Sequence, residues 1–445
     1  MKKFNLKNKS IQKGILIFII GLLSGVLLMT SLQHFQSSPS GKDAVKEEKI
    51  AEKDTAKDKE KNEEKDKETK QEENTSQYPS WDKSAVYNGG DKVIYEKKIY
   101  KAKWWTQGET PGNSDVWEDT KESITPVKDE KKKDSVTNKK HVETGDKKIV
   151  GYFPSWKPAK ADDLRYDELT DIIYAFAIPT SEGDLRPLDN ADIAKQIITK
   201  AHKQNVRVLL AVGGWSYNDV PLEATFVSAT ENDQKIKKFG DAIINMCDRY
   251  GFDGIDMDWE HPRVDGNTGK QYEALMLYLA DKLHDEKKLL TSAVLSGATA
   301  DGNVYYDAAA HSDAVLKAVD RIHVMAYDGG DGERHSPYDF SVNSIEYWTD
   351  TRNVDPNKVI LGVPFYARPS WAGYGDIIKE NKDAPKKDHV TYNGMDVYYN
   401  GLETMKKKAQ YAKKNCGGIM IWELSQDSSD DNMSLLKVIA DELSK

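Results

Sequence analysis

Residues 252–260 read Phe-Asp-Gly-Ile-Asp-Met-Asp-Trp-Glu, an alternation of apolar and acidic side chains. Successive side chains of a β-strand point to opposite faces. A strand here would therefore carry Asp256, Asp258 and Glu260 on one face and three apolar side chains on the other. The apolar face can pack against a helix, whereas three carboxylates on one face repel one another and must serve a purpose. His261 and Pro262 follow at once, so Glu260 is expected at the C-terminal tip of this strand.

Seven more short apolar runs accompany this one, at residues 149–153, 172–178, 206–212, 289–295, 321–327, 359–366 and 418–424. Stretches with apolar residues at helical spacing lie between them, at 192–203, 233–249, 270–286 and 401–414, and a last helix is expected at 433–443. Eight alternating repeats predict an α/β fold, a (β/α)8 TIM barrel over residues 148–445. An open doubly wound sheet is the alternative, but no Gly-rich phosphate turn follows the first strand. Catalytic residues of such barrels lie at the C-terminal ends of the strands.

The acids of the first run, read from Asp253 as Asp-x-x-Asp-x-Asp-x-Glu, resemble the signature of glycoside hydrolase family 18, the chitinases and their relatives. The sixth predicted strand ends in Tyr327-Asp328 and the eighth carries Trp422, as in members of that family. The resemblance therefore extends over residues 148–445.

The resemblance implies a role for each matching residue. Glu260 would donate a proton to the glycosidic oxygen, while Asp258 and Tyr327 would hold the N-acetyl group of the substrate. Asp256 would be the inner partner of Asp258, sharing a proton with it. The implied substrate-binding residues are Tyr152, Trp215, Asp328 and Trp422. No cofactor and no metal ion is implied.

The position of the acids on one strand also bears on mechanism. Most glycosidases flank the scissile bond with two carboxyl groups roughly 5–9.5 Å apart. Asp258 and Glu260 lie side by side, so they cannot easily approach a sugar from opposite faces. A single protein acid, with the substrate's own 2-acetamido oxygen as nucleophile, fits better, and family 18 is a known exception of this kind. The expected product is an oxazolinium ion that water opens with retention.

Two departures from the family pattern stand out. Ala211 occupies a position in the third predicted strand where many relatives have Ser, whose hydroxyl helps to stabilise the inner aspartate, here Asp256. Only about 33 residues separate Arg368 from the helix expected at Gly401, too few for the additional α+β lid of some chitinases. An open, shallow groove and endo-type cleavage are therefore expected.

The N-terminal part of the chain carries targeting information. Five lysines precede an uncharged run at residues 14–32, which is the pattern of a signal peptide or a signal anchor over residues 1–36. Residues 37–77 and 121–147 consist mostly of charged and small polar residues, and both are expected to be disordered linkers. The remaining chain would then be extracellular, either secreted or tethered to the cell surface.

Residues 78–120 form a small segment with a high aromatic content and alternating strand patterns. The block at 100–112, Tyr-Lys-Ala-Lys-Trp-Trp-Thr-Gln-Gly-Glu-Thr-Pro-Gly, resembles the chitin-binding modules of carbohydrate-binding families 5 and 12. A small all-β module has little core, so some of its rings must face the solvent. The resemblance implies a binding face made of Tyr100, Trp104 and Trp105.

The overall composition limits the kinds of partner and of covalent cross-link that are expected. The formal net charge of −9 is spread over mixed-sign runs, which gives no indication of a nucleic-acid partner. Cys247 and Cys416 fall on distant parts of the predicted barrel and are expected to be free thiols. A monomer is the default expectation, and membrane contact is expected only through the N-terminal segment.

Together these patterns predict an enzyme that hydrolyses chitin or a related polysaccharide of N-acetylglucosamine. One alternative is an endo-β-N-acetylglucosaminidase acting on glycoprotein glycans or peptidoglycan. A second is a non-catalytic chitin lectin, although such proteins typically lose the terminal Glu of the acidic run. A third is a site for Ca²⁺ or Mg²⁺ formed by the four acids, which would leave the aromatic partners unexplained.

Overall fold

The computed structural model describes residues 78, 81–83, 86–87, 89–122 and 145–445. The predicted signal or anchor at 1–36, the linker at 37–77 and most of the linker at 121–147 lie outside these residues. Among the helices of the described part, none combines the length and the apolar character needed to cross a membrane. Contacts divide the chain into two units, Met1–Lys131 and Lys132–Lys445, which are described separately.

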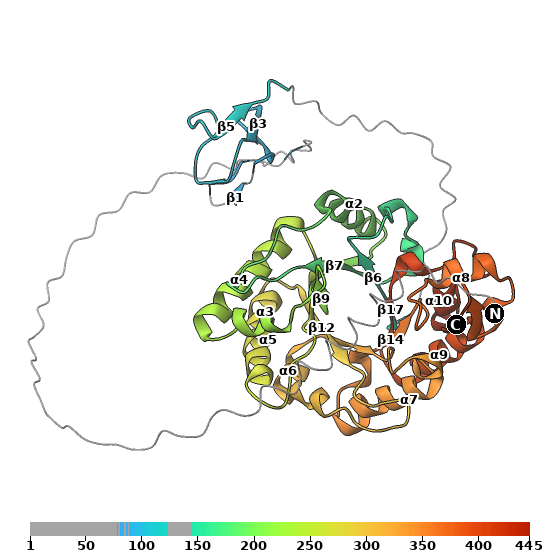
Figure 1. Cartoon of the computed structure of the whole chain (residues 1–445). Coiled ribbons are helices and arrows are strands. Elements are labelled where there is room, and N and C mark those ends of the chain that lie inside the picture. The colour runs from blue at the N-terminus through green and yellow to red at the C-terminus, as the bar shows by residue number, and fades with distance from the viewer. Residues whose placement is uncertain (1–77, 79–80, 84–85, 88, 123–144) are drawn as a thin grey trace, which may run out of the picture. The chain divides into compact units, whose positions relative to one another are not determined.

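The second unit is a closed barrel of eight parallel strands, with helices forming an outer ring (Figure 1). Going around the barrel, each strand pairs with the next, and the last pairs with the first. In chain order the strands are β6 (Lys148–Pro154), β7 (Asp171–Ala177), β8 (Arg207–Gly213), β11 (Gly254–Asp258), β12 (Leu289–Leu295), β13 (Arg321–Met325), β14 (Val359–Pro364) and β17 (Gly418–Trp422). This confirms the eight-stranded barrel predicted from the apolar runs.

Five helices of the outer ring follow the predicted positions within a few residues: α2 (Ala191–His202), α4 (Asp233–Tyr250), α5 (Thr268–Asp285), α9 (Leu402–Asn415) and α10 (Leu435–Ser444). Two more, α6 (Asp313–Ala318) and α7 (Tyr338–Glu346), were not predicted. Local sequence fixes the ends of α4, because the Asn232 side chain accepts from the backbone N–H of Lys235 and Gly251 ends the helix at φ +77°. The chain is thereby turned directly into β11.

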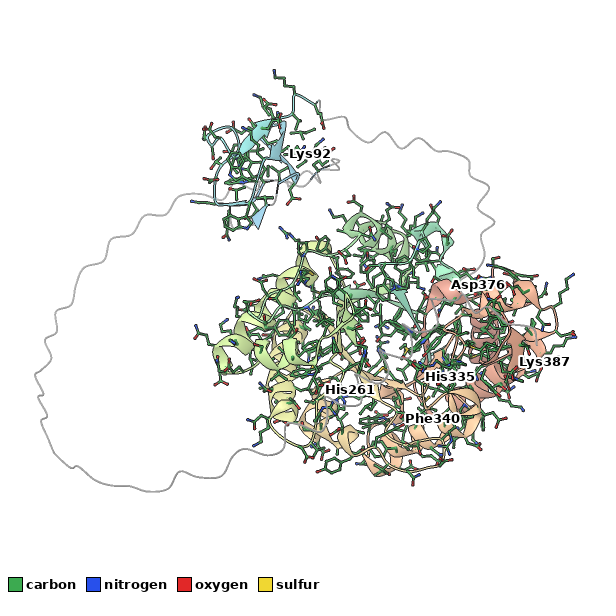
Figure 2. The ribbon with its side chains drawn as sticks, viewed as in Figure 1. Lys92, His261, His335, Phe340, Asp376 and Lys387 are labelled. Carbon is green, nitrogen blue, oxygen red and sulfur yellow. The ribbon has the colours of Figure 1, made fainter. Side chains whose placement is uncertain are left out.

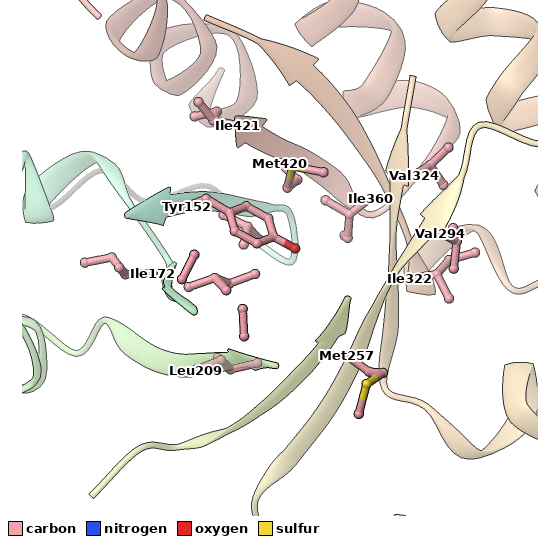
Figure 3. Packing of buried hydrophobic residues seen from close by; sticks show 14 of the residues in the cluster. Tyr152, Ile172, Leu209, Met257, Val294, Ile322, Val324, Ile360, Met420 and Ile421 are labelled. Carbon is pink, nitrogen blue, oxygen red and sulfur yellow. The ribbon is translucent and has the colours of Figure 1, made fainter. Parts of the chain in front are cut away.

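The interior of the barrel is filled by side chains. In Figure 3, Tyr152 of β6 reaches toward the middle of the ring of strands. Outside the ring, Trp259 packs between Phe226 and Tyr272, with ring centroids 4.8 and 6.0 Å away. Cys247 and Cys416 are both buried and free, as expected from the sequence.

The segment between β14 and α9 contains more structure than the sequence pattern predicted. A short helix, α8 (Tyr374–Glu380), is followed by an antiparallel pair, β15 (His389–Tyr392) and β16 (Met395–Tyr398). The segment is short, as expected, yet it forms an ordered edge of the barrel beside the loop that follows β13. Backbone hydrogen bonds between Arg368 and Tyr398 fasten the hairpin to the end of β14.

The first unit contains a small all-β module, as predicted. Strands β2 (Lys92–Tyr95), β3 (Lys98–Ala102) and β5 (Trp117–Asp119) form an antiparallel sheet, and β1 (Val86–Tyr87) pairs with β4 (Thr106–Gln107). Its buried core consists of only a few side chains: Tyr87, Val93, Tyr100, Ala102, Val116 and Trp117.

A buried ionic cluster holds the strands together at the end of the barrel where they begin. Asp171 is fully buried and accepts two hydrogen bonds from Arg321, at 2.9 and 3.1 Å, while Arg207 Nε lies 2.9 Å away. Burial alone would raise the pKa of Asp171, but the two guanidinium groups outweigh it and hold the pKa at about 2. Three strands that are distant in sequence are thus joined by one carboxylate.

We predict that Asp171→Asn lowers the free energy of unfolding by about 3–5 kcal/mol, because it leaves Arg321 buried without its charged partner. Because the pKa of Asp171 is depressed on folding, its contribution to stability is complete above about pH 4 and is lost as the pH falls to about 2. Urea denaturation as a function of pH measures both effects. The matched control is Asp376→Asn, which removes an exposed ion pair with Lys379 and should leave stability nearly unchanged. Equal stability of the Asp171→Asn variant and the wild type would contradict the prediction.

Candidate active site

The three acids of residues 252–260 become progressively more accessible toward the C-terminal end of β11. Asp256 is fully buried, Asp258 is 4% exposed, and the Glu260 side chain is 18% exposed. Strand β11 ends at Asp258, so Glu260 lies two residues past the strand rather than within it. The run thus places carboxyl groups from the barrel interior to its mouth.

Two glycines allow the neighbouring strand to approach the acids. Gly213, at the end of β8, has φ +117°, and a Cβ there would lie 2.3 Å from the carbonyl oxygen of Asp258. The N–H of Gly214 donates to that same oxygen at 2.9 Å. Any larger residue at Gly213 would push β11 away and displace the acids.

Asp256 is held as a carboxylate by three donors. Thr291 Oγ1 donates at 2.6 Å, His323 Nδ1 lies at 2.9 Å, and the Tyr152 hydroxyl donates to the other oxygen. Burial favours the neutral acid, but His323 and these hydrogen bonds outweigh it, so the pKa of Asp256 lies below its usual value. Ala211 is the strand neighbour of Asp256 in β8 and supplies no donor. The three other side chains satisfy the carboxylate without the missing Ser hydroxyl.

This network corrects the expectation for Tyr152. The residue is 2% exposed and its hydroxyl is engaged with Asp256, so the structure makes it part of the carboxylate network rather than a surface for substrate. The sequence could not distinguish these two roles, because the hydroxyl of an inward-pointing Tyr on a barrel strand can lie either inside the barrel or at its mouth.

Asp258 is in the opposite situation. Its Oδ1 atom is buried and has no hydrogen-bond partner among the described residues. Burial, and then the charges of Glu260 and Asp256, raise the pKa of Asp258 well above its usual range. The two aspartates therefore differ: Asp256 is the ionised member, and a proton shared by the pair resides mainly on Asp258.

Glu260 is poised between its two protonation states. Burial and the negative charge of Asp328 raise its pKa to about 7. His261 Nε2 lies 3.4 Å from the carboxylate, but burial lowers the pKa of His261 to about 4, so the imidazole is neutral at that pH. A carboxyl group with this pKa can donate a proton and later accept one near neutral pH.

Asp328 is positioned by residues that the sequence did not single out. Its backbone has φ +58°, and its N–H donates to His335 Nδ1 at 3.3 Å. The Tyr366 hydroxyl donates to its carboxylate at 2.7 Å, and Arg368 lies 3.6 Å away. Burial raises the pKa of Asp328, yet the hydrogen bond from the Tyr366 hydroxyl and the positive charge of Arg368 outweigh it and hold the pKa below its usual value.

Tyr327 precedes Asp328 and lies near the other acids. Burial and the charges of Asp258 and Glu260 raise the pKa of its hydroxyl well above its usual value, so the group is a neutral hydrogen-bond donor. The structure thus brings Asp256, Asp258, Glu260 and Tyr327 together, as the sequence pattern predicted.

Aromatic rings surround the mouth of the barrel. Trp422 stacks on Phe176 with centroids 6.0 Å apart, and Trp215 is 59% exposed. Two further exposed tryptophans near the barrel mouth were not predicted from the sequence. Trp156 is 55% exposed and stacks on Phe176 at 5.8 Å, and Trp371 is 56% exposed and stacks on Tyr366 at 5.4 Å. Their position just after β6 and β14 was the signal that could have identified them.

In the small module, Trp104 and Trp105 are 56% and 61% exposed, in agreement with a surface role. Tyr100 is 7% exposed and belongs to the module core, so it does not join them on the expected face. The strand alternation placed Tyr100 correctly in β3 but could not show which face of so small a sheet is covered.

The acids do not form a cation site in this arrangement. Asp253 points away from the other three and accepts from the N–H of Val208 at 2.7 Å and from His202 at 2.8 Å. Within the described ranges, no group of three or more His, Cys, Asp or Glu residues is placed to hold a metal ion.

Comparison with known proteins agrees with this geometry. Residues 148–427 match the model of glycosyl hydrolases family 18, and residues 80–118 match that of carbohydrate-binding module family 5/12. "Endochitinase 1" of Metarhizium robertsii is 24% identical over 352 residues, which cover 62% of this chain and 80% of that protein. "Probable chitinase 10" of Drosophila melanogaster is also 24% identical over 352 residues, but the match covers only 15% of that much longer protein.

Among solved structures, a family 18 chitinase from the chitin utilization locus of Flavobacterium johnsoniae superposes with a TM-score of 0.56 at 28% identity. The alignment covers 67% of this chain and 94% of that structure. A second, shorter match assigns the small module to carbohydrate-binding family 5/12. Since the first family model spans most of the chain and nearly the whole barrel, including the acids on and after β11, the chain belongs to family 18 of the glycosyl hydrolases.

Proposed function

We propose that this protein is an extracellular chitinase that hydrolyses β-1,4 linkages between N-acetylglucosamine residues with retention of configuration. The observation that carries the proposal is the pairing of two acids at one strand end: Glu260 with a pKa of about 7, and Asp258 with a raised pKa and an Oδ1 atom that finds no partner in the part of the chain that the structure describes. The first can transfer a proton to the leaving oxygen. The second can orient the acetamido group that acts as nucleophile.

In the first step, the acetamido oxygen of the substrate attacks C1 while Glu260 gives its proton to the glycosidic oxygen, and the C1–O bond breaks. The product is an oxazolinium ion and a sugar with a new hydroxyl group. Asp258 and Tyr327 hydrogen-bond the acetamido group and hold it under C1. An intramolecular nucleophile in this geometry has an effective molarity on the order of 10⁵ M or more.

In the second step, the Glu260 carboxylate accepts a proton from water as the water oxygen attacks C1 and reopens the oxazolinium ring. Two displacements at C1 leave the β configuration unchanged. Asp256, ionised by its three donors, stabilises the positive charge that develops nearby and keeps the shared proton on Asp258.

Chitin is favoured over glycoprotein glycans or peptidoglycan by the module at 80–118, whose two exposed tryptophans suit the flat apolar faces of a polysaccharide surface. The exposed rings Trp156, Trp215 and Trp371 lie around the barrel mouth, and with Trp422 they would contact several sugars of one chain. We assign endo-type cleavage on this basis. An N-terminal export signal or anchor would place both units outside the cell.

We predict that Glu260→Gln lowers kcat on chitotetraose by about 10²–10⁴-fold, because the amide cannot act as an acid. Product analysis by chromatography measures the rate, and proton NMR of the wild-type reaction identifies the first anomer, which should be β. The matched control, Glu403→Gln on the exposed face of α9, should retain full activity. Release of the α-anomer first would exclude the acetamido mechanism.

A second prediction concerns pH. Because Glu260 must be protonated for the first step and its pKa is raised, kcat/KM should fall as the pH rises, reaching half its maximum near pH 7. Removing the neighbouring negative charge with Asp328→Asn should move this midpoint to lower pH, whatever its effect on the maximal rate. An unchanged midpoint in that variant would show that another group controls the alkaline limb.

A third prediction separates the module from the barrel. Replacing Trp104 and Trp105 together by Ala should weaken binding to insoluble chitin by about tenfold, while hydrolysis of soluble chitotetraose is unchanged. Pull-down on chitin powder and the soluble assay measure the two effects. Replacing the exposed Lys101 of the same module by Ala is the control. Loss of soluble activity in the double variant would contradict an independent module.

A further inference from the structure

A large cavity lies on the flank of the barrel, away from the row of acids on β11. Its volume is about 960 Å³, near the upper end of the range of small-molecule sites. Three segments enclose it: residues 332–338 after β13, residues 388–400 of the β15–β16 hairpin, and the exposed side of α9. Among its lining residues, His335 also contacts the acids at the barrel mouth, through the N–H of Asp328.

The walls of this cavity are held in place by buried hydrogen bonds. Lys408 is fully buried in α9 and its Nζ donates to both the carbonyl and the hydroxyl oxygen of Ser336, at 2.8 Å each. Asn400 Nδ2 donates to the same carbonyl at 2.9 Å, and Ser336 Oγ donates to Ala326 O at 2.8 Å. The loop, the hairpin and α9 are therefore joined around a preformed space.

The lining has the composition of a sugar site. The half-buried rings of Tyr338, Tyr398 and Tyr411 line the cavity, and Tyr338 meets Tyr411 edge-on at 6.0 Å. Aromatic faces next to polar groups suit pyranose rings, which carry apolar C–H faces and a rim of hydroxyls. The polar side chains of Thr404, Gln410 and Asn415 line the cavity beside these rings.

The charges of the lining argue against a strongly charged ligand. Lys407 and Lys414 are offset by Glu333 and Asp388, and Asp388 already accepts from Gly401 N–H and Thr404 Oγ1 at 2.7 and 2.6 Å. Opposite charges in equal number give no net attraction for a phosphate or a polycation. A neutral, hydroxyl-rich ligand fits better.

We propose that this cavity is a second carbohydrate-binding site of the barrel, which takes short β-1,4 oligomers of N-acetylglucosamine. The choice of sugar rests on the proposed function, since such oligomers are the products of that reaction. The site is separate from both the barrel mouth and the module at 80–118.

One residue lies between the two sites of the barrel. His335, labelled in Figure 2, lines the cavity and is 1% exposed. Its Nδ1 accepts from the N–H of Asp328, and its Nε2 lies 3.2 Å from the carbonyl oxygen of Tyr366. Sugar bound in the cavity would therefore lie against the loop whose imidazole positions Asp328.

The test is hydrogen–deuterium exchange of the full-length Glu260→Gln protein titrated with di-N-acetylchitobiose. We expect slower exchange in peptides covering 388–400 and 402–415, in addition to peptides around the barrel mouth. Tyr411→Ala should raise the half-saturating sugar concentration for the cavity peptides by about tenfold, whereas the matched Tyr411→Phe, which keeps the ring, should not. A second variant, Lys407→Trp, fills the cavity from an exposed position of α9 and should also raise the half-saturating sugar concentration for the cavity peptides. It provides the test if Tyr411→Ala folds poorly.

Two results would overturn the inference. One is unchanged exchange in the cavity peptides at sugar concentrations that saturate the barrel mouth. The other is sugar-dependent slowing of exchange in the cavity peptides that is the same in Tyr411→Ala and in Lys407→Trp as in the parent protein. That result would mean that sugar bound at the barrel mouth, and not in the cavity, slows the exchange. Failure of the proposed function is seen separately, as absence of hydrolysis by the wild-type protein.

Discussion

The structure depends on one electrostatic constraint: several carboxyl groups are buried close together along one strand, and the cost of burying them must not unfold the barrel. Burial of an unpaired carboxylate is expensive. The barrel solves this by giving the innermost group, Asp256, three donors from β6, β12 and β13. The charge of Asp256 helps to raise the pKa of Asp258 above it. At the mouth, burial and the charge of Asp328 raise the pKa of Glu260, which retains the proton required for chemistry.

The same constraint explains why the loops after β13 and β14 are bound to one another. Asp328 stays ionised because the Tyr366 hydroxyl donates to its carboxylate and Arg368 lies nearby, while His335 holds its backbone N–H. The charge of Asp328 in turn raises the pKa of Glu260. The hairpin β15–β16 fastens to the end of β14 through Arg368, next to this group. The protonation of Glu260 therefore depends on a chain of contacts that reaches beyond the strand that carries it.

Much of this could be predicted from the sequence, because it is encoded locally. The alternation at 252–260 identified the inward-facing acids, and the periodic apolar runs identified the eight strands and five of the outer helices, but not α6 and α7. The predictions that were wrong concern how deeply a side chain is buried by other parts of the fold. Tyr152 and Tyr100 lie on the expected strands, but only the packing of neighbouring elements buries them. Trp156, Trp371, Tyr366 and His335 follow strands in loops, where no periodicity marks a residue that faces the site. The helix and hairpin between β14 and α9 are short and fastened by backbone bonds to Arg368, so their sequence carries little signal.

The two cysteines have a consequence of their own. Both thiols are free and buried, and burial raises the pKa of each, to about 12 for Cys247 and about 11 for Cys416. The thiolate, which is the species that oxidises and exchanges, is thus suppressed. The native state of the barrel rests on no disulfide, so reductants should not unfold it.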